Sequence, residues 1–312
     1  MRAPETGEPT SACQTQLMPF HYSGRIVIAG AGGLVGRFLA GQAALQGHDV
    51  LALASSEWDI TDGAAAERFI DAGDVVVNCA GYTQVDAAET DPERAAAINT
   101  AGAENVAHAC ARAGADLIHL STDYVFSGKF PDGNPRPYDI DDETGPLSVY
   151  GRTKLAGEFL VLSAMPEANV VRTAWVYEGG DGSDFAAGIR RAALGLEGSG
   201  TVDVVADQIG SPTYVGDLCA ALLEIAEGSI REPVLHAANV GGASRFEQAQ
   251  AIFEEVGADP NRVRPVGSDQ HPRPAPRPMY SVLSEVKSAA AGLTPLRPWR
   301  DALAEALGKA GA

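Results

Sequence analysis

The chain has 312 residues, of which 45% are hydrophobic, enough to form one large core or two modest lobes. Its formal net charge of -18 argues against nucleic acid or an anionic membrane as a partner, and no apolar run approaches the length of a membrane span. Cys13, Cys79, Cys110 and Cys219 are scattered without a C-x-x-C pair or a histidine cluster. We therefore expect reduced thiols, a cytoplasmic location and no metal site.

Three parts follow one another along the chain. Residues 1–23 are rich in Thr, Pro, Ser and Gln and lack the apolar core of a signal peptide, so we expect a flexible N-terminal tail. We expect residues 24–177 to form a dinucleotide-binding domain that also carries the catalytic residues. Residues 178–312 are then mainly a smaller substrate-binding lobe, with some segments returning to the first domain.

A glycine-rich turn comes first. The apolar run Ile26-Val27-Ile28 is typical of a buried parallel strand, and it leads into Gly30-Ala31-Gly32-Gly33-Leu34-Val35-Gly36. Glycines let the backbone turn sharply and approach a pyrophosphate, which then meets the unpaired amides of the helix expected over 34–46. The spacing is G-x-x-G-x-x-G instead of the usual G-x-G-x-x-G. The other reading is a tight turn without a ligand.

Strands and helices then alternate. Further strands are expected at 48–54, 74–78, 116–120 and 169–172, separated by helical segments at 62–72 and 92–113. This order predicts an α/β fold with a doubly wound parallel (Rossmann) sheet, whose ligands lie at the carboxyl ends of the strands. Cys79, Ala80 and Gly81 follow the third strand and are small enough to let a flat group lie against this edge.

The end of the second strand bears on the choice of dinucleotide. Ala54-Ser55-Ser56 offers neither the carboxylate that holds a ribose 2′-hydroxyl nor a cation for a 2′-phosphate. The serine hydroxyls and Arg37 favour phosphate, whereas Glu57 and Asp59 would repel it if they turned inward. We expect both NADPH and NADH to work, with a modest preference for NADPH.

Tyr150 and Lys154 are the candidate catalytic pair. Side chains four apart on a helix point the same way, so an ammonium can sit beside a phenol. A free phenol titrates near pH 10, and a neighbouring cation lowers that value toward neutrality. Thr122, which closes an apolar run, can supply a hydroxyl to a carbonyl oxygen on the same side. Tyr-x-x-x-Lys also occurs on many solvated helices, so its meaning depends on its surroundings.

The C-terminal third is less regular. Strands are expected near 202–205 and 235–239, and helices at 185–194, 215–226, 244–256 and 299–307. Residues 130–146 carry four prolines and five acidic residues, which indicates a surface loop, and 270–278 is expected to cross back toward the cleft.

Five segments in one order resemble the extended short-chain dehydrogenase/reductases, and within that superfamily the dTDP-4-dehydrorhamnose reductases. The likeness covers most of the chain after the tail. The segments are NCAGYTQVDAAE (78–89), STDYVF (121–126), VYGRTKLAGE (149–158), RTAWVY (172–177) and DQIGSPT (207–213).

The resemblance implies NAD(P)H-dependent reduction of the C4 ketone of a dTDP-4-keto-6-deoxyhexose, in deoxysugar biosynthesis. Thr122 would hold the keto oxygen, Tyr150 would protonate it, and Lys154 would bind the nicotinamide ribose and lower the tyrosine pKa. The implied cofactor-binding residues are Gly30, Gly33, Leu34, Val35, Gly36, Asp59, Ile60, Cys79, Ala80, Gly81, Tyr150 and Lys154. The implied substrate-binding residues are Val85, Thr122, Tyr124, Tyr150 and Trp175, although Val85, Tyr124 and Trp175 also suit ordinary core packing.

The sequence departs from the family pattern at one metal position. Some members bind Mg²⁺ between subunits through an acidic residue two places after the last glycine of the loop, where this chain has Phe38. A metal-linked dimer is therefore not expected, and both a monomer and a homodimer remain open.

Two other functions are compatible with parts of the pattern. One is a non-catalytic regulatory subunit of the methionine adenosyltransferase type, which would not need both the phenol and the ammonium. The other is a nucleotide-sugar epimerase or dehydratase. Dehydratases of this superfamily usually place an acid pair after the catalytic hydroxyl, and here Asp123 is followed by Tyr124.

Overall fold

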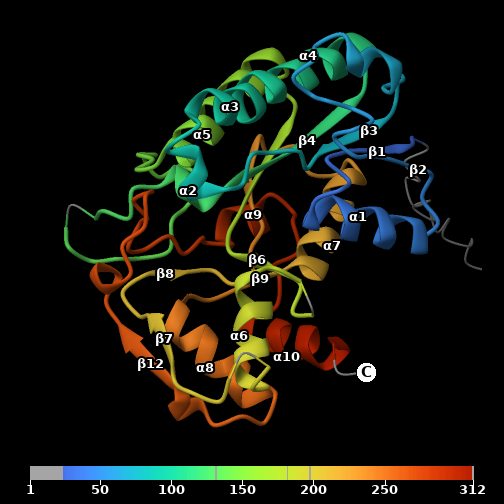
Figure 1. Cartoon of the computed structure of the whole chain (residues 1–312). Coiled ribbons are helices and arrows are strands. Elements are labelled where there is room, and N and C mark those ends of the chain that lie inside the picture. The colour runs from blue at the N-terminus through green and yellow to red at the C-terminus, as the bar shows by residue number, and fades with distance from the viewer. Residues whose placement is uncertain (1–23, 131, 181, 197, 311–312) are drawn as a thin grey trace, which may run out of the picture.

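A six-stranded parallel sheet forms the centre of the molecule (Figure 1). The computed structural model describes residues 24–130, 132–180, 182–196 and 198–310, so the expected tail, 1–23, lies outside the described residues. The strand order is β10-β5-β4-β3-β1-β2, and every neighbouring pair is parallel. These strands are β1 (Ile26–Ala29), β2 (Val50–Leu53), β3 (Val75–Asn78), β4 (Asp116–Thr122), β5 (Asn169–Thr173) and β10 (Val234–His236).

The strand order reverses at β1. The chain moves from β1 to β2 on one side, then returns to β3 on the other side and continues outward through β4 and β5. Connections from β1 and β3 therefore leave in opposite directions and open a crevice at their carboxyl ends. The doubly wound sheet expected from the alternating pattern is confirmed.

Helices cover both faces of this sheet (Figure 1). On one face α4 (Ala103–Ala113) and α5 (Val149–Ala164) bury Val106 and Val161 against Val76 and Val170. On the other face, α1 (Leu34–Leu45) packs beside α7 (Val215–Ala226). Within the described ranges, no helix combines the length and the apolar character needed to cross a membrane.

The C-terminal part of the chain gathers beyond the crevice, in the lower half of Figure 1. It contains α6 (Phe185–Ala193), α8 (Arg245–Glu255) and α10 (Trp299–Ala310). Short strand pairs accompany them: β7 (Val202–Val205) with β12 (Val263–Val266), β8 (Ile209–Gly210) with β11 (Ala243–Ser244), and β6 (Val176–Tyr177) with β9 (Thr213–Tyr214). Ile189, Phe253 and Leu303 from these helices share one hydrophobic cluster with Ile28 of the sheet, so the core is continuous.

Three segments differ from the sequence expectations. The strand expected at 235–239 is β10, which completes the main sheet beside β5 and does not lie in the lobe. The helix expected at 62–72 is only a short 3-10 turn, Ala65–Arg68. The helix expected at 92–113 is α3 (Pro92–Ala96), a π-helical segment (Ala97–Gly102) and α4.

Asn99 explains the π-helical segment. Its amide oxygen accepts a hydrogen bond from the Tyr82 backbone N–H at 2.7 Å, and its amide nitrogen donates to Tyr82 O and Thr153 Oγ1, each at 3.1 Å. The wider π-helical turn directs the Asn99 side chain toward Thr153 on α5. Helical periodicity alone does not reveal such tertiary hydrogen bonds.

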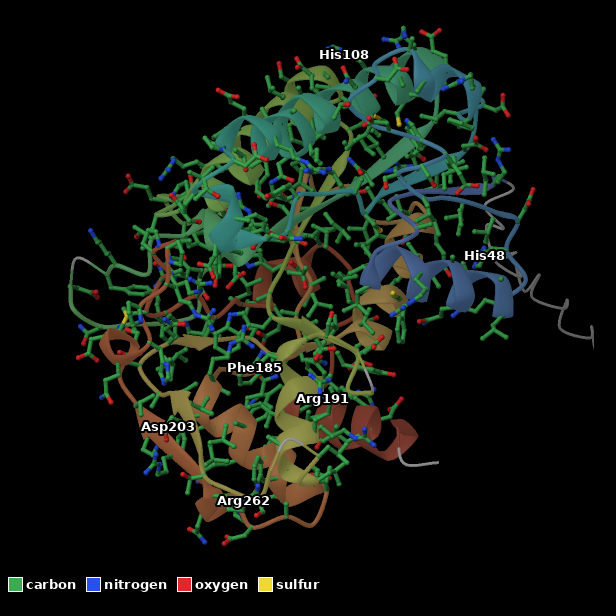
Figure 2. The ribbon with its side chains drawn as sticks, viewed as in Figure 1. His48, His108, Phe185, Arg191, Asp203 and Arg262 are labelled. Atoms are coloured by element: carbon green, nitrogen blue, oxygen red, sulfur yellow. The ribbon has the colours of Figure 1, made fainter. Side chains whose placement is uncertain are left out.

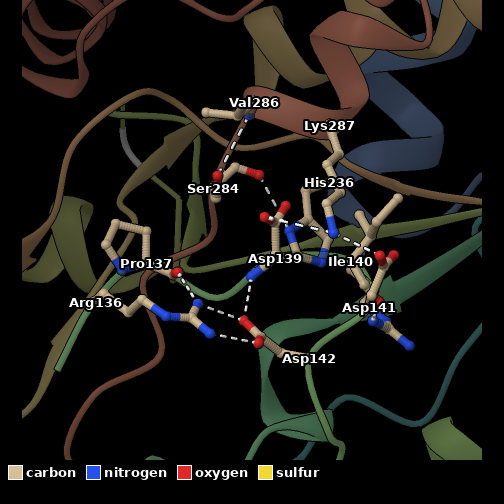
Figure 3. A network of polar contacts seen from close by, with 11 residues as sticks. Arg136, Pro137, Asp139, Ile140, Asp141, Asp142, His236, Ser284, Val286 and Lys287 are labelled. Carbon is tan, nitrogen blue, oxygen red and sulfur yellow. Dashed lines mark hydrogen bonds and ion pairs between the residues drawn. The ribbon is translucent and has the colours of Figure 1, made fainter. Parts of the chain in front are cut away.

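The proline-rich loop at 130–146 is fixed by charges (Figure 3). Arg136 makes two hydrogen bonds to Asp142, at 2.6 and 2.7 Å, while Lys287 contacts Asp141 at 2.5 Å and Asp139 at 3.7 Å. Lys287 lies on α9 (Val286–Ala290), so the loop before α5 is joined to a distant part of the sequence.

We predict that Gly157→Ala destabilises the fold. A Cβ at Gly157 on α5 would lie 2.2 Å from the backbone oxygen of Asn99, so the two helical segments would have to separate. The expected cost is about 1–3 kcal/mol in the free energy of unfolding, measured by urea denaturation. Gly308→Ala on α10 is the matched control, because nothing lies within 4 Å of its added Cβ, and it should be neutral or stabilising. Equal stability of both variants would contradict the packing argument.

Candidate active site

The glycine turn is closed by tight contacts with the neighbouring strand. Gly30 has φ +78°, and a Cβ there would lie 2.6 Å from the backbone nitrogen of Ala80, which follows β3. A Cβ at Gly36 would lie 2.5 Å from the backbone oxygen of Gly30. Both positions therefore require glycine, for the left-handed backbone at Gly30 and for close approach at Gly36.

The N-terminus of α1 begins at this turn. Gly33 is the N-cap and supplies no side-chain cap, so the first amides of α1 receive no hydrogen-bond acceptor from a capping side chain. Gly33, Leu34 and Val35 line the cavity described below. Free amides with the positive end of a helix dipole fit a pyrophosphate.

A cavity of about 430 Å³ opens at the carboxyl ends of β1, β3, β4 and β5. Thr122 at the end of β4 and Tyr150 and Lys154 on α5 all line it, so residues from two elements meet as expected. Its other lining residues are Gly33, Leu34, Val35, Cys79, Ala80, Gly81, Thr83, Val85, Leu120, Ser121, Asp123, Tyr124, Thr173, Ala174, Trp175, Val176 and Arg245.

Lys154 is buried, and its ammonium is held by the backbone. Nζ donates a hydrogen bond to the carbonyl oxygen of Leu120 at 2.5 Å. Burial lowers the pKa of Lys154 to about 8, while the carboxylate of Glu158 acts in the opposite direction. The lysine is therefore cationic at neutral pH and loses its charge within the mildly alkaline range.

Burial also dominates the pKa of Tyr150. It raises the pKa of the phenol, although a hydrogen bond with the Thr122 side chain acts to lower it. This differs from the sequence expectation of a pKa lowered by Lys154, because the ammonium is directed at the Leu120 carbonyl in this arrangement. The phenol thus keeps its proton at neutral pH, as a proton donor must.

Asp123 and Ser281 extend the polar network behind Thr122. Thr122 Oγ1 donates to Asp123 Oδ1 at 3.1 Å, and Ser281 Oγ donates to Asp123 Oδ2 at 2.6 Å. Burial raises the pKa of Asp123 to about 6, because these two donors offset only part of the cost of desolvating the carboxylate. A residue from the C-terminal part of the chain therefore contacts the neighbour of the candidate catalytic threonine.

An ion pair beneath Lys154 fixes α5 to the sheet. Arg172 of β5 donates from Nη2 and Nε to Glu158 of α5 at 2.7 and 3.0 Å, and both side chains are almost fully buried. Ser121 Oγ donates a further hydrogen bond to Glu158. The carboxylate is thus fully hydrogen-bonded between the strand that carries Thr122 and the helix that carries Lys154.

The backbone of Trp175 is unusual. Trp175 has φ 47°, and it is the one residue other than glycine with positive φ among those that the structure describes. A Cβ at Gly210 would lie 2.4 Å from the indole, so the ring packs directly over that glycine. Left-handed backbone at a bulky side chain is costly and is found mainly at functional sites.

Most of the expected site residues converge, and a few lie elsewhere. Cys79, Ala80, Gly81, Val85, Tyr124 and Trp175 line the cavity. Asp59 and Ile60 do not line it, since Asp59 is exposed and bonded to Thr61, and Ile60 is buried. Gly30 and Gly36 shape the turn without lining the cavity.

Among the polar residues that line the cavity, sequence reasoning did not predict Thr83, Ser121, Asp123, Thr173 and Arg245. Asp123 directly follows Thr122, so its position could have identified it. Arg245 lies more than ninety residues after Tyr150 and follows a helix N-cap, and nothing in its local sequence indicates a site.

Two groups that bear on the choice of dinucleotide have protein partners. Arg37 pairs with Glu178 at 2.7 Å, and Glu57 accepts a hydrogen bond from the Ala54 backbone N–H at 2.9 Å. The Glu57 carboxylate thus turns back onto the end of β2, while the charge of Arg37 is partly neutralised.

The sheet is parallel and carries a glycine turn at its switch point, and one cavity holds Thr122, Tyr150 and Lys154. Together these features define a nucleotide-binding α/β enzyme of the reductase and epimerase class. The family model "RmlD substrate binding domain" matches residues 24–311, and the chain belongs to this family.

Known relatives agree with this placement. The dTDP-4-dehydrorhamnose reductase of Mycolicibacterium smegmatis is 65% identical over 283 residues, which cover 91% of this chain and 85% of that protein. The reductase of the same name from Mycobacterium tuberculosis is 62% identical over 285 residues, covering 91% and 93%. The crystal structure of the Bacillus anthracis dTDP-4-dehydrorhamnose reductase in complex with NADP superposes with a TM-score of 0.83 at 33% identity, covering 92% and 99%.

We predict that Glu158→Gln destabilises the protein by about 3–5 kcal/mol, because Arg172 would be left buried without its carboxylate. Urea denaturation with linear extrapolation measures this loss. Glu254→Gln provides the control: Glu254 pairs with Arg300 at 3.2 Å on the surface, and its loss should cost less than about 1 kcal/mol. A Glu158 variant as stable as the control would show that the buried pair is not needed.

Proposed function

We propose that this chain reduces the C4 ketone of a dTDP-4-keto-6-deoxyhexose with NADPH or NADH, as a dTDP-4-dehydrorhamnose reductase in deoxysugar biosynthesis. The observation that carries the proposal is the meeting of Thr122, Tyr150 and Lys154 in one cavity beside the glycine turn. The names of the relatives at 65% and 62% identity support the same activity.

The residues of the crevice fit a nicotinamide dinucleotide. When bound, the reduced nicotinamide supplies the hydride. The Gly30 turn and the uncapped amides at the start of α1 would hold the pyrophosphate, and Ala80 and Gly81 would offer a flat surface along the dinucleotide. Asp59 and Ile60 would border the adenine, as the family resemblance implies. Lys154 would bind the nicotinamide ribose through its ammonium.

Tyr150 delivers the proton to the keto oxygen. Its phenol stays protonated at neutral pH because burial raises its pKa, so the proton is available whenever substrate binds. Thr122 holds the same oxygen. Its single hydroxyl proton is directed at Asp123 in this structure, so the hydroxyl must rotate away from the carboxylate to donate to a ketone.

Val85, Tyr124 and Trp175 form the wall that faces the sugar. The Tyr124 ring meets the Tyr150 ring edge-on, with centroids 5.9 Å apart, so Tyr124 also fixes the phenol in place. The close contact of Trp175 with Gly210 holds the indole in the cavity wall.

The alternatives are less well supported. Dehydratases of this superfamily usually place an acid pair after the catalytic hydroxyl, and here Asp123 is followed by Tyr124. A regulatory subunit of the methionine adenosyltransferase type has no use for a phenol, an ammonium and a hydroxyl directed into one cavity. Neither alternative appears among the names of the relatives at 62–65% identity.

We also propose a cytoplasmic location, which the scattered cysteines favour, and a monomer or homodimer. Cell fractionation tests the location, and sedimentation velocity at micromolar concentration distinguishes the two assembly states.

The proposed activity is tested with Tyr150→Phe. Wild-type protein should oxidise NADPH only when the nucleotide ketosugar is added, and the variant should lose at least about 100-fold in kcat because it lacks the proton donor. Its Kd for NADPH should stay within threefold, measured by fluorescence titration. Tyr138→Phe is the control, since Tyr138 stacks on Phe126 and does not line the cavity. Full turnover by Tyr150→Phe would remove the phenol from the mechanism.

The pH dependence should report Lys154. Its pKa is lowered to about 8, so the ammonium is present below that pH and is lost above it. We expect kcat/KM to be constant around neutral pH and below, to reach half its plateau at the pKa of Lys154, and to fall about tenfold per unit well above that pKa. Lys154→Arg should be slower but should lack this alkaline limb, because a guanidinium does not titrate in the range. A wild-type profile that stays flat to pH 10 would contradict this assignment.

A further inference from the structure

Arg245 is a cation held by aromatic rings. It begins α8, and its guanidinium carbon lies 3.6 Å from the ring centroid of Trp175 and 4.7 Å from that of Phe185. Its Nη1 donates to the neutral amide oxygen of Gln248 at 3.2 Å. Within the part of the chain that the structure describes, no carboxylate forms an ion pair with it.

The charge of Arg245 is poorly compensated. Burial lowers the pKa of this arginine to about 10, and Asp123 and Asp184 attract the charge only at longer range, while Arg277 repels it. The oxygens of Asp123 are already engaged by Thr122 and Ser281. A desolvated cation without a close partner is costly, so an anion brought by a ligand would stabilise it.

Arg245 stands between two cavities. It lines the active-site cavity of about 430 Å³ and a second cavity of about 390 Å³ within the C-terminal part of the chain. Among the described residues it is the one that lines both. Figure 2 labels Phe185 and Asp203 in this lower region; they line the second cavity together with Ile189, Val204 and Gln208.

The other arginines of the second cavity already have partners. Arg277 binds both carboxylate oxygens of Asp86, at 2.9 and 3.0 Å. Arg273 lies 3.8 Å from the same carboxylate, and 65% of its side chain is exposed to solvent. Their charges are therefore neutralised or hydrated, which leaves Arg245 as the cation with the most to gain from a bound anion.

We propose that Arg245 binds the diphosphate of the nucleotide sugar at the junction of the two cavities, and this assignment rests on the proposed function. The sugar then faces Tyr150, and the nucleoside occupies the second cavity. Stacking of the rings on a guanidinium face leaves its N–H edges for two phosphate oxygens, a geometry that a lysine does not reproduce. The same stacking joins diphosphate binding to the orientation of Trp175.

Calorimetric titration of thymidine diphosphate in the presence of saturating NADP⁺ tests the proposal. Arg245→Met should raise Kd at least tenfold relative to wild type, while the Kd for thymidine, which lacks phosphate, changes less than twofold. Arg245→Lys, which keeps the charge but not the two-pronged geometry, should raise it at least fivefold. Arg300→Met removes an exposed arginine of the same region, paired with Glu254, and should leave Kd within twofold.

Two outcomes would overturn the assignment directly. Unchanged thymidine diphosphate binding by Arg245→Met would overturn it, as would a loss seen only in Arg273→Met. If Arg245→Met weakened thymidine binding as much as thymidine diphosphate binding, the effect would be structural and would not report a contact with the diphosphate. If Arg245→Met does not fold, Arg245→Lys decides alone. If thymidine diphosphate binding depends on Arg245 but the wild-type protein does not reduce the ketosugar, the proposed function is wrong and this binding site stands. If the wild-type protein reduces the ketosugar but Arg245→Met binds thymidine diphosphate as wild type does, the proposed function stands and this binding site is wrong.

Discussion

The buried ammonium of Lys154 is the constraint on which the site depends. A charge beneath the edge of a sheet needs an acceptor, and the carbonyl of Leu120 supplies one at 2.5 Å. It also needs a nearby negative charge, which Glu158 provides on the same helix; Arg172 of β5 pairs with that carboxylate. Because Tyr150 lies one helical turn before Lys154, fixing the lysine also fixes the phenol at the cavity wall.

Backbone geometry sets the opposite wall. Gly30 and Gly36 bring the turn so close to the end of β3 that side chains would not fit at either position. Trp175 adopts a left-handed conformation beyond β5 and rests on Gly210 of the C-terminal part. The crevice is therefore formed by rigid elements on both sides, which favours a defined position for any ligand.

The two halves of the molecule share one core and one polar network. Ser281 reaches Asp123 beside Thr122, and Arg277 binds Asp86 on the helix that follows the third strand. Arg245 joins the active-site cavity to the second cavity. The residues that line the two cavities thus come from distant parts of the sequence but are fixed to each other.

The sequence by itself determined the parallel sheet, the glycine turn and the placement of Tyr150 and Lys154 on one face of a helix, because these depend on local periodicity and on a spacing of one helical turn. It also placed Thr122 correctly at a strand end. Only the tertiary structure decided the return of β10 to the main sheet, the π-helical segment around Asn99, the direction of the Lys154 ammonium and the position of Arg245. Each of these depends on contacts between residues tens of positions apart, which the order of the residues does not encode locally.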